Sequence, residues 1–312
     1  MQPLVGRVAL VAGATRGAGR GIARMLGEAG ATVVCTGRSS REGPSVGHHY
    51  SGRPETIEET AALVTAAGGQ GIARRVDHHD EGQVAALFDA VRREHGRLDV
   101  LVNVLTGPRI HDWREFTRVP LAEGRVMLDG WLWPHITTCW YAVPMMTAQR
   151  SGLIVEVTEH ESLRYHAQMF FDLAIVGLKR LMLNLAEELT PCGVAALTVA
   201  PGFMRTEATL ERFGVTEETW REAVDDPTPK RFGWAGSESP CFVGRAIAAL
   251  AADPRVLQKS GGMYGSWDLS DEYGFTDIDG ERPHWGRYGA EHFPQFFATK
   301  PKAPHQWVVA RS

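Results

Sequence analysis

The sequence predicts an α/β fold: a Rossmann-like, doubly wound parallel sheet with helices on both faces, in a single domain. Three observations lead to this prediction. Short apolar runs alternate with helix-like runs, the first apolar run leads into a glycine-rich turn, and no linker divides the 312 residues. Strands that alternate with helices pair in parallel, and right-handed crossovers place the helices on both faces.

The expected strands are apolar, and the expected helices lie between them. We expect strands at 7–12, 32–36, 72–76, 98–103, 152–157 and 194–200. We expect helices at 19–29, 54–67, 81–95, 124–147, 168–190 and 241–252. Residues 203–240 interrupt the pattern before the last of these helices.

The glycine turn follows the first strand with the spacing Gly13-x-x-x-Gly17-x-Gly19, and Thr15 lies within it. Glycines let the backbone approach a pyrophosphate closely, and the N-terminus of the following helix offers unpaired N–H groups. The spacing differs from the common G-x-G-x-x-G pattern. We therefore expect a phosphate cradle here, with a purely structural turn as the alternative.

Two arginines indicate which dinucleotide this cradle would hold. A carboxylate usually follows the second strand and binds the ribose 2′-OH, but Arg38 stands at that place and Arg16 lies inside the turn. Arginines suit a 2′-phosphate, through charge-assisted and bidentate hydrogen bonds. The pattern predicts NADP(H) rather than NAD(H); the alternative is that both are solvated surface residues.

Composition and charge argue against several other classes of protein. The net charge is −4 with both signs spread along the chain, so we expect no nucleic-acid or membrane partner. No apolar run approaches the ~18 residues that a spanning helix needs. The four cysteines are widely spaced and the histidines have no metal-ligand spacing, so we expect reduced thiols, a cytoplasmic protein and no metal.

Further segments resemble the short-chain dehydrogenase/reductase (SDR) superfamily over residues 5–262. Asp77 matches the family's adenine-contacting acid, and Asn103 is retained from its N-N-A-G segment. Pro201-Gly202 and Thr206 match P-G-x-x-x-T, which implies contacts with the nicotinamide and its carboxamide. The tail at 273–283 resembles the branch of dehydrogenase/reductase SDR family member 1.

The resemblance also implies how the chain is organised. Residues 1–262 would form the dinucleotide-binding and substrate domain. Residues 263–312, rich in aromatic residues, would be an extension packed on the same domain, over the pocket or an interface. A homodimer or homotetramer would form through the helices at 124–147 and 168–190.

The family's acid–base pair is absent. Members of the superfamily use a Tyr with a Lys four residues later, on one helix face. No Tyr here is followed by a Lys at that spacing. The helix end at 186–189 and Pro201-Gly202 set a register in which Phe171 takes the Tyr position and Ile175 the Lys position.

Several residues are candidates to replace this pair. Thr158 could supply the family's serine hydroxyl, and Glu159 is adjacent to it. Gln168 shares a helix face with Phe171, while Tyr165 and His166 lie in the preceding loop. A core or surface role is the alternative for the nearby aromatic residues and histidines, which are Trp131, Trp133, Trp140, His135 and His160. An aromatic pocket with Glu159 and Glu161 at its rim would suit a flat, bulky or cationic small molecule.

Three functions fit this combination of a retained cofactor site and an altered acid site. The first is an NADP(H)-dependent oxidoreductase that reduces an imine- or iminium-like or conjugated substrate without the usual Tyr acid. The second is a non-redox cyclase, isomerase or dehydratase on the same scaffold. The third is a non-catalytic NADP(H)-binding partner subunit.

Overall fold

The fold is described from a computed structural model, for residues 2–43, 52–108, 115–159, 168–230 and 232–294. Seven parallel strands form one sheet in the order β3-β2-β1-β4-β5-β6-β7. The strands are β1 Val8–Ala12, β2 Thr32–Gly37, β3 Gln70–Arg75, β4 Val100–Asn103, β5 Gly152–Val157, β6 Val194–Ala200 and β7 Met263–Gly265. The predicted Rossmann-like class is thus confirmed, and β7 is a strand that the sequence analysis did not predict.

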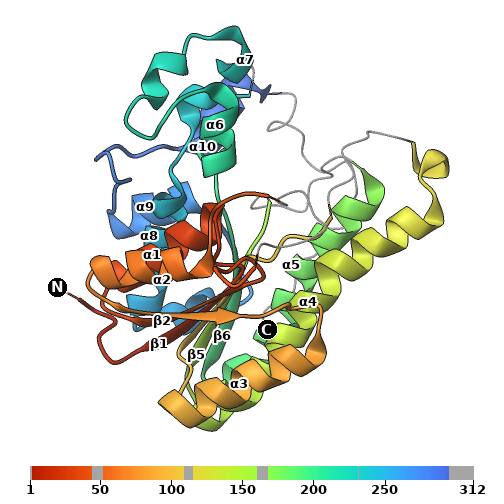
Figure 1. Ribbon diagram of the computed structural model, residues 1–312, viewed down its shortest axis with the longest axis vertical. Coiled ribbons are helices and arrows are strands. Elements are labelled where there is room, and N and C mark those ends of the chain that lie inside the picture. The colour runs from red at the N-terminus through yellow and green to blue at the C-terminus, as the bar shows by residue number, and fades with distance from the viewer. Residues whose placement is uncertain (1, 44–51, 109–114, 160–167, 231, 295–312) are drawn as a thin grey trace.

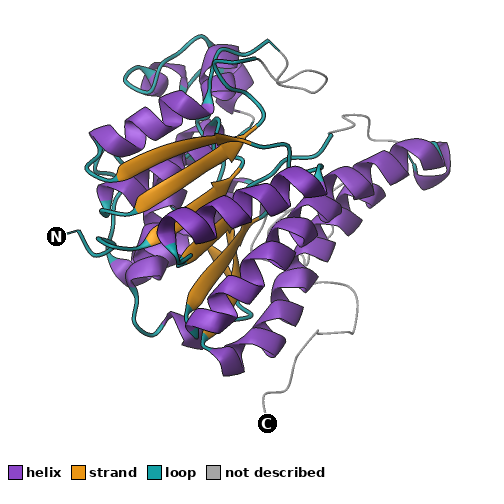
Figure 2. Ribbon diagram, turned by 60° about the horizontal axis from the view of Figure 1, so that its bottom comes forward, coloured by secondary structure: helices purple, strands orange, loops and turns teal. Residues whose placement is uncertain are grey.

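The helices cover both faces of the sheet (Figure 1, Figure 2). They are α1 Gly17–Glu28, α2 Ile57–Ala66, α3 Glu81–His95, α4 Leu121–Gln149, α5 Met169–Leu189, α6 Glu207–Phe213, α7 Pro227–Lys230, α8 Pro240–Ala252, α9 Ser266–Tyr273 and α10 Trp285–His292. The six predicted helices correspond to α1–α5 and α8. The interrupted stretch at 203–240 contains α6, α7 and two short 3₁₀ helices, Trp220–Ala223 and Trp234–Gly236.

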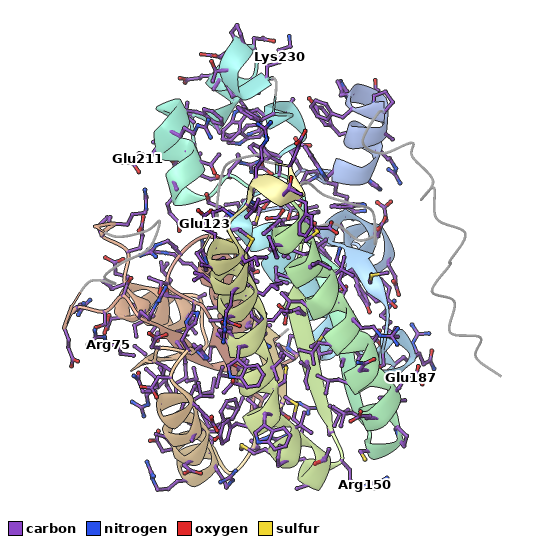
Figure 3. The ribbon with its side chains drawn as sticks, turned by 90° about the vertical axis from the view of Figure 1, so that its right-hand side faces the viewer. Arg75, Glu123, Arg150, Glu187, Glu211 and Lys230 are labelled. Carbon is purple, nitrogen blue, oxygen red and sulfur yellow. The ribbon has the colours of Figure 1, made fainter. Side chains whose placement is uncertain are left out.

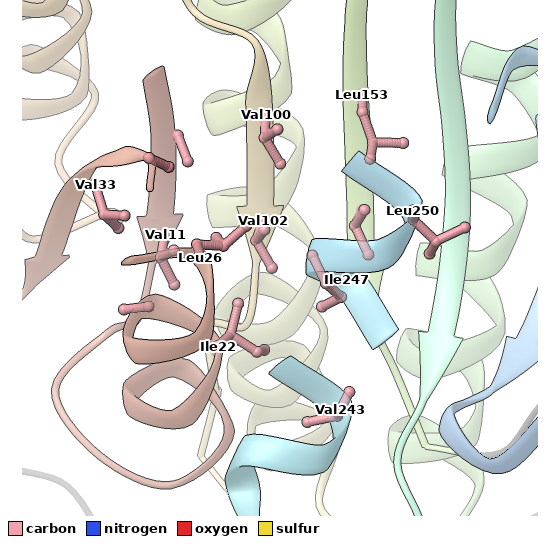
Figure 4. Close-up of a cluster of buried hydrophobic side chains, with 14 of the residues drawn as sticks. Val11, Ile22, Leu26, Val33, Val100, Val102, Leu153, Val243, Ile247 and Leu250 are labelled. Atoms are coloured by element: carbon pink, nitrogen blue, oxygen red, sulfur yellow. The ribbon is translucent and has the colours of Figure 1, made fainter. Parts of the chain in front are cut away.

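Two apolar clusters hold the layers together. Helices α1 and α8 pack on one face through Ile22, Leu26, Val243 and Ile247, which meet strand residues such as Val11 (Figure 4). Helices α3, α4 and α5 pack on the other face. Because successive strand side chains alternate between faces, continuous apolar runs are needed to fill both clusters.

The segment after β7 is tied to the rest of the domain by a buried guanidinium. Arg205 is buried and forms ion pairs with Glu217 at 2.7 Å and with Asp277 at 3.3 Å. Its Nη1 also donates to the carbonyl of Ser237 at 2.6 Å. Because Arg205 is buried, losing one of these contacts would leave a charge unpaired away from water and destabilise the fold.

Candidate functional site

A cavity of about 590 Å³ opens along the carboxyl ends of the strands. Parallel α/β sheets bind ligands at this edge, where the strand order reverses direction. Here the reversal lies between β1 and β4. The cavity is lined by most of the predicted site residues. They are Gly13, Thr15, Arg16, Gly17, Arg38, Asp77, Thr158, Glu159, Pro201, Gly202 and Thr206.

The glycine turn has the close approaches that a phosphate cradle requires. Gly13 has a φ of +95°, and a Cβ there would lie 2.6 Å from the carbonyl oxygen of Val104. A Cβ on Gly19 would lie 2.1 Å from the carbonyl oxygen of Gly13. Both positions therefore exclude side chains, and the turn leads directly into the first turn of α1, whose N–H groups have no intrahelical partners.

A carboxylate already contacts one of these N–H groups. Gly17 N–H donates to Oε2 of Glu207 at 2.8 Å, and Oε1 of the same carboxylate lies 3.8 Å from Nε of Arg20. Glu207 is the first residue of α6 and lines the cavity. This contact places a negative charge at the start of α1, where the helix dipole and the unpaired N–H groups favour one.

The two predicted arginines both line the cavity, but their contacts differ. Arg16 donates to Glu55 and to Ser39 Oγ, each at 3.2 Å, so it is a paired residue and not a solvated one. Arg38 lines the cavity and forms no ion pair within the described ranges. Partial burial disfavours ionisation of Asp77, but the His79 N–H and the charge of Arg38 outweigh it and lower the pKa of Asp77.

Asn103 lies away from the cavity. Its side chain is fully buried at the end of β4 and donates through Nδ2 to Sγ of Cys139 at 3.3 Å. The structure therefore places it among core residues, and it is not among the residues that line the cavity. Strand alternation explains this, because Asn103 points to the α4 side while Val104 lines the cavity.

At the opposite end of the cavity, the Pro201-Gly202 turn is held by the carboxyl group of Glu238, which is buried. Gly202 N–H donates to Oε2 of Glu238 at 2.9 Å, and Ser266 Oγ donates to the same oxygen at 2.6 Å. Burial raises the pKa of Glu238 to about 8. Thr206 lines the cavity, and its hydroxyl accepts from Thr209 N–H at the start of α6.

The wall beside this end is largely apolar. It is formed by Trp131, Ile175 and the Thr158 and Glu159 pair at the end of β5. Phe171 lies one turn before Ile175 and meets Trp131 edge to face, with ring centroids 5.3 Å apart. The two residues that the register assigns to the acid–base positions therefore lie at this wall.

The other candidate residues are placed differently. Gln168 immediately precedes α5, is buried, and does not contribute to the described lining of the cavity. Tyr165 and His166 lie outside the described residues, as do His160 and Glu161. Trp133 and Trp140 are 61% and 73% exposed, so they belong neither to the core nor to the pocket.

Sequence reasoning missed several residues of the site. Trp267 and Trp285 line the cavity from α9 and α10. The aromatic composition of the tail indicated that it covers a pocket or an interface, but no spacing showed which rings would do so. Glu207 and Glu238 carried no signal, since their roles depend on contacts with glycine N–H groups distant in sequence.

Comparison with known proteins places the chain among dehydrogenases. A family profile described as short chain dehydrogenase matches residues 7–214. Dehydrogenase/reductase SDR family member 1 from Mus musculus is 34% identical over 289 residues, covering 89% of this chain and 85% of that protein. The Homo sapiens protein of the same name is 32% identical over 286 residues, with the same coverage.

Solved structures share the fold. A short chain dehydrogenase from Mycobacterium thermoresistibile has a TM-score of 0.71 at 23% identity, covering 90% of this chain and 92% of its own. A metagenomic short-chain oxidoreductase in complex with NADP has a TM-score of 0.59 at 25% identity, covering 80% of this chain and 92% of its own.

Within the described ranges, we find no helix both long and apolar enough to cross a bilayer.

Proposed function

The chain belongs to the short-chain dehydrogenase/reductase family, and we propose that it is an NADP(H)-dependent oxidoreductase that works without the family's tyrosine acid. Its substrate would be an imine- or iminium-like or conjugated small molecule. One observation carries the proposal: a single cavity runs from a phosphate cradle and a cationic end to a wall formed by Trp131, Ile175 and Thr158.

The residues present fit the cofactor. The glycine turn would hold the pyrophosphate, as its contact with the Glu207 carboxylate indicates. Arg38, with Arg16 behind it, would bind the 2′-phosphate, and Asp77 would meet the adenine. The Pro201-Gly202 turn and Thr206 would hold the nicotinamide half. When bound, the reduced cofactor supplies a hydride to an electrophilic carbon.

The apolar wall limits the substrate. Phenylalanine has no proton to donate, and isoleucine cannot hold a ribose, so a simple ketone would lose an acid worth ~10²–10⁴-fold in rate. A cationic or conjugated acceptor needs less assistance. Glu159 lies at the wall and would stabilise positive charge, while Trp131, Trp267 and Trp285 would pack against a flat molecule.

Cofactor binding and turnover test this proposal separately. We expect tighter binding of NADPH than NADH, measured by energy transfer from tryptophan to the reduced nicotinamide. Arg38→Ala should weaken NADPH binding and leave NADH binding nearly unchanged. Equal binding of the two cofactors by the wild type would refute the assigned 2′-phosphate site.

Turnover is measured by stopped-flow loss of NADPH absorbance with a panel of imines, iminium salts, conjugated carbonyls and ketones. Oxidation with the first three classes and little with simple ketones is the expected result. Product formation without NADPH oxidation would favour the non-redox alternative. No reaction with any compound would favour a non-catalytic subunit.

An exposed apolar stripe supports a homo-oligomer. Val126, Trp133 and Trp140 recur every seven residues along α4 and are 58%, 61% and 73% exposed. Leu173 of the adjacent α5 is 49% exposed. Large side chains in a stripe on neighbouring helices are typical of an interface, and we propose that a second copy of the chain covers them.

A further inference from the structure

A carboxyl group lies inside the sheet, beneath the cavity. Glu156, near the carboxyl end of β5, is fully buried, and its register partners are Asn103 on β4 and Thr198 on β6. Strands of a parallel sheet are covered on both faces and normally carry apolar side chains here. Burial raises the pKa of Glu156, and His135 and Asn103 oppose the shift. A carboxyl group in this position must have polar partners.

One partner is an equally buried histidine. Nδ1 of His135, on α4, lies 2.8 Å from Oε1 of Glu156. The two atoms are close, but their geometry is not that of an aligned hydrogen bond. The imidazole ring and the carboxyl group therefore contact each other inside the fold. Cys139 and His78 are the other titratable groups that act on the pair, and burial raises the pKa of the first and lowers that of the second to about 3.

Polar atoms without hydrogen-bond partners concentrate around this pair. In the part of the chain that the structure describes, eight buried side-chain atoms have none, and six are clustered here. They are Oδ1 of Asn103, both ring nitrogens of His135, both carboxyl oxygens of Glu156 and Oγ1 of Thr158. Buried polar atoms in proteins are bonded to other groups or to ordered water. Ordered water would give these atoms their partners, and we call the space between them the chamber.

The neighbouring polar residues do not share this feature. The hydroxyls of Thr36 and Thr138 each lie within hydrogen-bond distance of a ring nitrogen of His78, and each also lies within that distance of a backbone carbonyl, that of Val11 or of Pro134. These three side chains therefore have hydrogen-bond partners within the protein.

The chamber adjoins the reaction end of the cavity. Thr158 lines the cavity and lies two residues after Glu156, one residue past the end of β5. Trp131 also lines the cavity and precedes His135 by one helical turn. On the other side, Asn103 donates to Cys139, which belongs to the apolar core. Among the described residues, the chamber thus has apolar core on one side and the cavity on the other.

We propose that His135 and Glu156 hold the proton that reaches the substrate through water and the Thr158 hydroxyl, in place of the family's tyrosine. This inference rests on the proposed function. As hydride adds to the acceptor carbon, the π electron pair moves to the acceptor nitrogen or oxygen, which takes a proton from Thr158. Thr158 regains a proton through water from the His135–Glu156 pair, and solvent restores the pair after product leaves.

This proton supply favours one part of the proposed substrate class. A neutral imine or a conjugated carbonyl needs one hydride and one proton, whereas an N-alkylated iminium ion needs only the hydride. Thr158 is the catalytic residue here, and His135 and Glu156 are positioning residues that supply its proton. If His135 and Glu156 had a purely structural role, replacing either would slow the reduction of both acceptors by the same factor.

The first test compares a neutral cyclic imine with its N-methylated iminium salt. Glu156→Gln should lower the ratio of their single-turnover hydride-transfer rates, imine over iminium, by ~10²-fold. Thr158→Val should lower the same ratio and remains informative if Glu156→Gln fails to fold. Asp99→Asn is the control, since it removes a buried carboxylate paired with Arg7 and Arg97 at the opposite edge of the sheet. Equal slowing of both acceptors by Glu156→Gln or Thr158→Val overturns the proposal.

The second test needs no substrate and separates this inference from the proposed function. The ring N–H of His135 is observed by nitrogen-15 NMR, and its exchange with water is measured. We expect fast exchange in the wild type despite complete burial, and exchange slowed about tenfold or more in Thr158→Val. Protection like that of core amides, or exchange unaffected by Thr158→Val, overturns the proposal. If the wild type reduces neither acceptor but shows this exchange, only the proposed function has failed.

Discussion

The contact between Glu207 and the glycine turn gives a sharp prediction about cofactor affinity. The carboxylate accepts from Gly17 N–H at 2.8 Å, where the pyrophosphate of a dinucleotide would bind. Binding must displace it, and its charge would then lie beside two phosphates. Glu207→Gln should therefore tighten NADPH binding, although it changes a residue that lines the cavity.

The size of the effect follows from the exposure of the side chain. A hydrogen bond to a charged group contributes about 1.5–3 kcal/mol when buried. The Glu207 side chain is 32% exposed, so solvent screening reduces this to about 1 kcal/mol. Since about 1.4 kcal/mol is a factor of ten in Kd, the dissociation constant of NADPH should fall about fivefold.

Isothermal titration calorimetry with NADPH measures this change. Glu187→Gln is the matched control, because it removes the same charge from an exposed position near the end of α5, far from Glu211 and the rest of α6 (Figure 3). The control should bind NADPH like the wild type. Weaker binding by Glu207→Gln, or an equal gain in the control, would show that the carboxylate does not compete with the cofactor.

Three further predictions concern assembly and stability. Trp133→Glu should convert the oligomer to a monomer in light scattering, since it places a charge on the exposed stripe; an unchanged mass rules out that interface. Glu238 has a folded-state pKa of about 8, above its ordinary 4.5, so the folded state retains a proton that the unfolded chain releases. The free energy of unfolding should fall by about 1.4 kcal/mol per pH unit between those values, and Glu238→Gln should abolish this slope in urea titrations. Arg205→Met should cost about 3–5 kcal/mol because Glu217 and Asp277 lose their counter-charge, and a loss below about 1 kcal/mol in the same assay contradicts the buried network.

The fold could be predicted because its signals are local. Apolar runs at 152–157 and 194–200 coincide with β5 and β6, and the run at 81–95 coincides with α3. The strands at the edges of the sheet were harder to predict from the sequence. β7 has only three residues and a half-exposed pattern, so its pairing with β6 depends on the sheet already being present.

The candidate site was predictable only in part. The glycine turn and Pro201-Gly202 have fixed backbone requirements that spacing reveals. The direction of a side chain could not be predicted from spacing. Trp131 lines the cavity, whereas Trp133 and Trp140 on the same helix face outward. A continuous apolar helix such as α4 has no polar face from which the sequence alone would indicate its orientation.

By itself, the sequence determined the class of fold, the place of the glycine turn and the absence of a Tyr-x-x-x-Lys pair, because each depends on residue type and spacing along the chain. Only the tertiary structure decided that Glu207 contacts this turn, that Asn103 is buried in the core, and that His135 meets Glu156. These contacts join residues that are distant in sequence, and their partners are selected by strand register and helix packing, which no local pattern encodes.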